Sequence, residues 1–207
     1  SQHFPPDLEW QVVYDPTVFV RDSIKAVIIT LLEAILLVVI VVVLFLQTWR
    51  AAIIPLLAVP VSIIGTFGIL YLSGFSINTL TLFALVLSIG IVVDDAIVVV
   101  ENVERNIAAG LSSVAAAHRA MREVSGPIIA ISLVLIAVFI PMAFLSGVTG
   151  QFYRQFAITI AIATGISAIN SLTLSPALAA VILRGHNETP DKFTHIINKM
   201  FGWVFRS

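Results

Sequence analysis

The sequence predicts an all-α membrane protein, a bundle of five transmembrane helices followed by an amphipathic helix at the membrane surface. Two observations carry this prediction. The chain is 59% hydrophobic and only 11% charged, with a mean hydropathy of +1.06, which lies outside the range of soluble globular domains. It also contains five apolar runs that reach the length of about 20 residues that a helix needs to cross the hydrocarbon core.

The five predicted spans end at charged residues, glycine or proline. The spans run approximately over residues 24–46, 52–72, 80–100, 128–145 and 156–183. Pro55 and Pro60 predict kinks in the second span, because proline removes a backbone hydrogen bond. Polar residues inside the fifth span predict packing against other helices, namely Asn170, Ser171, Thr173 and Ser175. We interpret residues 24–183 as the transmembrane domain.

The segments outside the spans predict three further elements. Before the first span, Leu8, Trp10, Val12 and Tyr14 alternate with other residues, a pattern typical of a strand that ends a soluble domain. The aqueous connection 101–125 contains an alanine-rich stretch, 113–121, which favours a short helix. Residues 184–207 form a linker and an amphipathic interfacial helix, with Phe193, Ile196, Ile197, Met200, Phe201 and Val204 at helical spacing.

The positive charges beside the spans predict the orientation. One side of the membrane collects Arg50, Arg105, Arg119, Arg122, Arg184, Lys192, Lys199 and Arg206. The other side holds only Arg21, Lys25 and Arg154. The first side is expected to be cytoplasmic, which places residues 1–23 outside the cytoplasm. Because the chain has no initiator methionine, we expect it to be a fragment of a larger protein.

Composition and missing motifs argue against several other functions. The chain has no cysteine, and its net charge of -1 gives no basic surface for nucleic acid. It lacks a phosphate-binding loop, the zinc-protease HExxH motif and a Gly-x-Ser-x-Gly nucleophile elbow. His118, His186 and His195 lie apart in the predicted aqueous segments. We therefore expect neither an enzyme nor a metal site nor a cofactor.

Two adjacent carboxylates, Asp94 and Asp95, lie inside the otherwise aliphatic third span. At the centre of a membrane helix each aspartate costs roughly 2.5–3.5 kcal/mol, while an aliphatic residue returns only about 0.3–0.6 kcal/mol. Packing gives no reason for such a pair, so a functional role is the default interpretation. In low dielectric, burial and mutual repulsion both disfavour the ionised forms, and such a site can bind and release protons. The alternative is that the pair lines a water-filled pore and sets only its charge.

Two further residues are candidates for supporting roles. Gly90 lies one turn before Asp94, which gives a neighbouring helix room to approach. Glu33 lies about two turns inside the first span, where it could assist proton entry or simply reach the interface. No Lys, Arg or His lies inside the spans beyond Lys25 at the start of the first, so a countercharge for the aspartates must come from outside this chain.

The residues around the pair resemble a known family. The runs Gly74–Thr81 and Asp94–Arg105 resemble the fourth transmembrane helix of resistance-nodulation-division efflux pumps, in their hydrophobe/amphiphile efflux branch. Pro141–Phe144, Thr149–Phe156 and Leu174–Leu178 are similar to the family's fifth and sixth helices, and Leu44–Gln47 and Tyr14–Asp15 to its second helix and the preceding strand. The resemblance implies that the spans are helices two to six of twelve, and that residues 1–23 end a periplasmic porter subdomain.

The resemblance also implies a mechanism and partners. Asp94 and Asp95 would form a proton relay with a lysine from the tenth helix, so the proton gradient would drive export from a bacterial inner membrane. The intact pair favours drugs, dyes or detergents over metal ions as substrates. The family further implies a homotrimer joined to a periplasmic adaptor and an outer-membrane channel. Two alternatives stay open, a passive channel or membrane scaffold, and an exporter of protein or lipid.

Overall fold

The computed structural model describes residues 16–46 and 48–183 and folds them into long helices. The helices are α1 (Pro16–Leu46), α2 (Trp49–Leu72), α3 (Thr79–Ala108), α4 (Ser113–Phe139), the 3₁₀ helix η1 (Ile140–Phe144) and α5 (Gly147–Ile182). Five segments are long and apolar enough to cross a membrane, and the described residues contain no strand. The predicted all-α, five-helix architecture is therefore confirmed. The predicted strand before residue 15 and the amphipathic helix after residue 191 lie outside the described residues.

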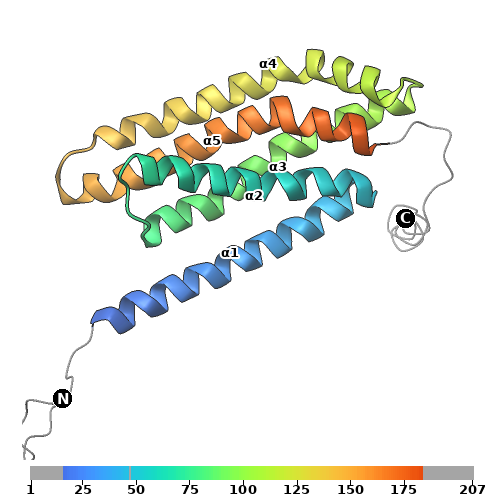
Figure 1. Ribbon diagram of the computed structural model, residues 1–207. Helices are drawn as coiled ribbons and strands as arrows, with labels where there is room; N and C mark the ends of the chain where they lie inside the picture. The colour runs from blue at the N-terminus through green and yellow to red at the C-terminus, as the bar shows by residue number, and fades with distance from the viewer. Residues whose placement is uncertain (1–15, 47, 184–207) are drawn as a thin grey trace, which may run out of the picture.

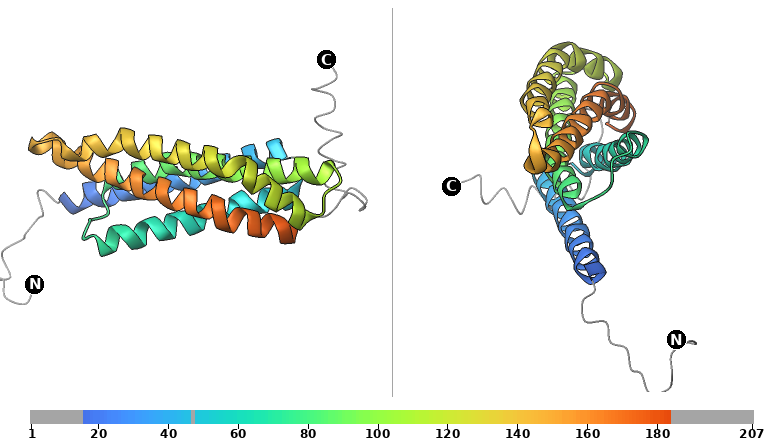
Figure 2. Two further views of the ribbon diagram at one scale, coloured as in Figure 1. Left: turned by 90° about the horizontal axis from the view of Figure 1, so that it is seen from above. Right: turned by 90° about the vertical axis from the view of Figure 1, so that its left-hand side faces the viewer.

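Helix α3 lies at the centre of the bundle and contacts all four of the other long helices. Helices α2, α4 and α5 surround it, whereas α1 crosses the bundle at an angle and its N-terminal end stands away from the rest (Figures 1 and 2). Alanine supplies much of the packing surface, because its small side chain lets helix backbones approach closely. Ala51, Ala84, Ala96, Ala116 and Ala179 are all fully buried.

The ends of the helices follow from local sequence. Asn78 begins α3 with a capping box, in which its side chain accepts from the Thr81 backbone N–H and the Thr81 hydroxyl accepts from the Asn78 N–H. Helices α2 and α3 both end in a Schellman motif, with Gly74 (φ +71°) and Gly110 (φ +94°) in the left-handed conformation. These caps satisfy backbone groups that the last helical turns leave unpaired.

The helices extend beyond the spans that hydropathy predicted. Helix α1 begins at Pro16 rather than near residue 24, and α2 runs without a break through Pro55 and Pro60. The alanine-rich stretch 113–121 is not a separate short helix, because α4 continues from Ser113 through the apolar segment to Phe139. The prediction of a separate helix was wrong because no residue between the two segments breaks the helix, including Pro127, which lies inside α4.

Candidate functional site

The two aspartates lie on different faces of α3. Asp95 is only 7% exposed and faces the interior of the bundle, whereas Asp94 is exposed. Successive residues on a helix point about 100° apart, so two neighbouring residues are both buried only if other helices cover both of those directions. Within the described helices, only Asp95 faces the interior of the bundle. The two carboxylates have different surroundings.

Asp95 is bonded to the neighbouring helix α5. The Ser167 hydroxyl donates to Asp95 Oδ2 at 2.7 Å, and Ser167 is fully buried. Helices α3 and α5 make the most extensive contact in the bundle, and the short serine side chain lets them approach at this point. A hydroxyl donor stabilises the ionised form of a carboxylate. No cation contacts either aspartate among the described residues.

A second buried hydrogen bond joins α5 to α2 close to this point. The Asn170 amide, one turn beyond Ser167, donates to Ser62 Oγ at 2.8 Å, and both residues are buried. The Thr66 hydroxyl, one turn further along α2, donates a hydrogen bond to the Ser62 backbone oxygen at 2.7 Å. Helix α5 is thus fixed by polar contacts to α3 on one side and to α2 on the other.

Polar residues recur at seven-residue spacing along the buried face of α3. Thr81, Ser88 and Asp95 are all buried and lie on nearly the same side of the helix, since seven residues complete almost two turns. The Ser88 hydroxyl donates to the Ala84 backbone oxygen at 2.7 Å, which satisfies it within the helix. Near Ser88, a small cavity between α2, α3 and α5 is bordered by Ser62, Thr66 and Ala163.

Asp94 lies on a stripe of α3 that none of the described helices covers. The stripe repeats every three or four residues, which is the spacing of one helix face. Its exposed members are Phe83, Leu87, Gly90, Asp94, Val98 and Glu101. A β-carbon added to Gly90 would meet no atom within 4 Å, so nothing in the described chain uses the space that this glycine leaves. This mostly apolar, exposed stripe with a glycine in its middle is open to contact by a further helix.

Glu33, the other predicted supporting residue, is not brought to the aspartates. Its side chain on α1 is exposed and forms no hydrogen bond or ion pair with any described residue. Sequence reasoning missed Ser167 as a partner of Asp95 and noted Asn170 only as a packing residue. Their shared signal is that they are polar residues, one turn apart, in an otherwise apolar helix.

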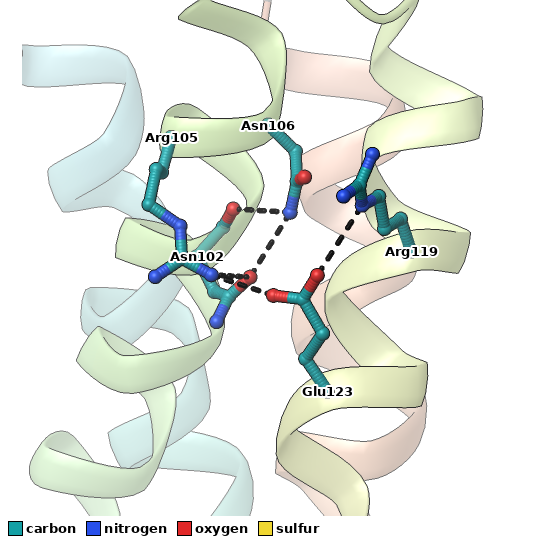
Figure 3. A network of polar contacts seen from close by, with 5 residues as sticks. All are labelled: Asn102, Arg105, Asn106, Arg119 and Glu123. Atoms are coloured by element: carbon teal, nitrogen blue, oxygen red, sulfur yellow. Dashed lines mark hydrogen bonds and ion pairs between the residues drawn. The ribbon is translucent and has the colours of Figure 1, made fainter. Parts of the chain in front are cut away.

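A polar network joins the C-terminal end of α3 to the N-terminal part of α4 (Figure 3). Arg105 Nη2 donates to Glu123 Oε2 at 2.5 Å and to Asn102 Oδ1 at 3.3 Å, while Arg119 Nε reaches Glu123 Oε1 at 3.3 Å. Asn106 donates to both oxygens of Asn102. On the opposite side of α3, the Thr48 hydroxyl donates to Glu104 Oε1 at 2.9 Å, which connects the start of α2 to α3. Within the described chain, no three His, Asp or Glu side chains gather to hold a metal ion.

These features define a multi-pass membrane protein with a pair of carboxylates in its central helix. The whole chain, residues 1–207, matches the model of the AcrB/AcrD/AcrF family, and it belongs to that family of resistance-nodulation-division efflux transporters. The resemblance inferred from the sequence is confirmed.

Several curated relatives are about half identical to the chain. They include the toluene efflux pump membrane transporter TtgB of Pseudomonas putida, which is 49% identical over 99% of this chain and 19% of its own length. The multidrug resistance protein MdtF of Escherichia coli K12 is 52% identical over 91% of this chain and 18% of its own length. The multidrug export protein AcrF of the same strain is 50% identical over 97% of this chain and 19% of its own length. The chain thus spans about a fifth of the length of these relatives.

Proposed function

We propose that this chain is the part of an efflux pump's membrane domain in which Asp94 and Asp95 bind and release protons to drive export. The cargo would be hydrophobic or amphiphilic compounds, as the names of the relatives suggest for those proteins. The observation that carries the proposal is the buried Asp95, bonded to Ser167 inside the bundle, directly beside an exposed Asp94 in the same apolar helix. Neither the cavity near Ser88 nor the groove lined by His118 and Arg122 is bordered by Asp94 or Asp95, so neither supports the passive-channel alternative.

The different surroundings of the two carboxylates support a transfer role. Asp95 exchanges its proton inside a packed interface, where a change in charge alters the contact between α3 and α5. Asp94 faces outward on the uncovered stripe of α3. We propose that the lysine-bearing tenth helix of the full-length pump packs on this stripe, with Gly90 at its closest approach. A lysine there would supply the cation that neither aspartate contacts among the described residues.

The remaining features of the pump are proposed from the family. The full-length protein would be a homotrimer in a bacterial inner membrane, joined to a periplasmic adaptor and an outer-membrane channel. The excess of arginine in the C-terminal end of α3 and the N-terminal end of α4 supports the proposal that this end of the bundle is cytoplasmic. The proton gradient would be the energy source, with no bound cofactor.

The proposal is tested by dye efflux from cells that carry the full-length pump. Asp94→Asn and Asp95→Asn are compared with wild type at matched membrane expression, with and without a protonophore. Asp22→Asn, on the exposed start of α1, is the matched control. We expect both site variants and the protonophore to abolish efflux, and the control to retain it. Protonophore-resistant efflux that persists in both variants would favour a passive channel in which the pair sets only charge.

A further inference from the structure

The connection between α3 and α4 carries a groove away from the aspartate pair. It is lined by Leu111, Ala115, His118, Arg119, Arg122 and Glu123. Positions 115, 118, 119 and 122 lie at intervals of three and four residues, so one face of α4 forms most of the groove. The groove therefore combines a short apolar end with a cluster of nitrogen donors.

The groove carries excess positive charge. Its one carboxylate, Glu123, is already shared between Arg105 at 2.5 Å and Arg119 at 3.3 Å (Figure 3). Of the other carboxylates at this end of α3, Glu104 bonds to Thr48 on the side of α2, and Glu101 is exposed. Within the described part of the chain, Arg122 forms no hydrogen bond or ion pair. Arg122 and the remaining donors of Arg119 are thus available to an anion.

Arg122 lies close to the depth of the lipid headgroups, and Arg119 lies further from the membrane core. The apolar part of α4 begins at Ile128. Arg122 and Arg119 precede it by about 9 Å and 14 Å along the helix, at 1.5 Å per residue. The headgroup region extends roughly 5–7 Å beyond each side of the hydrocarbon core. The long stem of Arg122 lets its guanidinium reach back into that region, whereas the backbone of Arg119 lies about 7 Å beyond it.

We propose that this groove binds the phosphate of an anionic phospholipid, with Arg122 and Arg119 as the phosphate-binding residues and His118 as an additional donor. A planar guanidinium can donate two parallel hydrogen bonds to phosphate oxygens, which gives geometry as well as charge. A bound lipid anchors the start of α4 to the membrane surface and holds the turn between α3 and α4 in place. The inference does not depend on the role of the aspartates.

Native mass spectrometry of the delipidated full-length pump tests the proposal by titration with phosphatidylglycerol and, separately, phosphatidylcholine. We expect wild type to bind phosphatidylglycerol more tightly than phosphatidylcholine. Each arginine replaced should lower the affinity for phosphatidylglycerol roughly fivefold, once in Arg122→Gln and twice in Arg119→Gln/Arg122→Gln. Arg122→Lys keeps the charge and is expected to retain most of the affinity. Arg154→Gln, an exposed arginine at the start of α5 on the opposite membrane face, is the matched control and should bind like wild type.

Three outcomes would overturn the assignment. Equal affinities of wild type and the double variant would remove the arginines from lipid binding, and Arg122 is exposed enough that its replacement should not unfold the protein. Displacement of the lipid by inorganic phosphate would assign the groove to soluble phosphates. Rapid disulfide formation between Arg122→Cys and Glu188→Cys in lipid-loaded protein would show that the chain's own residues around Glu188 occupy the groove instead of a lipid.

Discussion

Removal of the Ser167 hydroxyl is expected to change the pH at which the pump works. Ser167 is fully buried and donates to Asp95 Oδ2 at 2.7 Å. A hydrogen bond to a charged group contributes about 1.5–3 kcal/mol, and each 1.4 kcal/mol is about a tenfold change in equilibrium. The same bond contributes about 0.5–1.5 kcal/mol when the carboxyl is neutral, so its loss in Ser167→Ala should favour the proton-bound form by the difference, about 1–1.5 kcal/mol or roughly fivefold to tenfold. Proton release then needs a lower proton concentration.

Export at neutral pH should therefore fall in Ser167→Ala, and the activity profile should move toward alkaline pH by about one unit. The assay is substrate transport by the full-length pump in proteoliposomes, with the pH varied in the compartment that receives the protons. Ser167→Thr keeps the hydroxyl and should remain close to wild type. Ser175→Ala is the control, because the Ser175 hydroxyl is buried in the same helix and has no hydrogen-bond partner among the described residues. A Ser167→Ala profile that superimposes on wild type would refute the reasoning.

Two further predictions concern stability, measured as the apparent Tm of the full-length pump in detergent. Ser62→Ala should lower the Tm because it leaves the buried Asn170 amide without its acceptor, and Ser62→Ala/Asn170→Leu should lower it by less than the two single changes together. The interaction energy between the Ser62 and Asn170 side chains should be about 0.6 kcal/mol and at most about 1.7 kcal/mol. Strictly additive Tm shifts would contradict this expectation. Gly150→Ala should destabilise strongly because its β-carbon would lie 2.0 Å from the Leu145 backbone oxygen, whereas Gly165→Ala meets nothing within 4 Å and should not. Equal Tm values for these two variants would exclude the clash.

The helices could be predicted from the sequence, but their ends could not. A membrane span needs a fixed length of apolar sequence, so the number of helices follows directly from hydropathy. Hydropathy reports how deep a residue lies in the membrane, however, and not whether the backbone is helical. Helix α4 therefore begins at Ser113, where the Ser112 hydroxyl caps it, long before the apolar segment starts at Ile128. Ser112 is a typical residue for the start of a helix and is visible in the sequence, and the helix begins there even though its first turns are polar.

The aspartate pair stands out in the sequence because of its cost in lipid, but its partners do not. Asp95 meets Ser167 only because α3 and α5 run side by side, and they are separated by 72 residues in the chain. Nothing local distinguishes Ser167 from Ser171, which is equally buried one turn further along α5. Which serine bonds depends on the rotation of each helix and on the register between them, and hydropathy determines neither.

The two buried hydrogen bonds of α5 differ in how they respond to protons. The bond from Ser167 to Asp95 is strong while the carboxylate is charged, about 1.5–3 kcal/mol, and falls to about 0.5–1.5 kcal/mol when its acceptor is neutral. The bond from Asn170 to Ser62 joins two neutral groups and does not change. Proton binding therefore loosens α3 from α5 while α5 stays fixed to α2. If the pair carries protons as proposed, the sliding surface lies between α3 and the α2–α5 unit, and the uncovered face with Asp94 moves with α3.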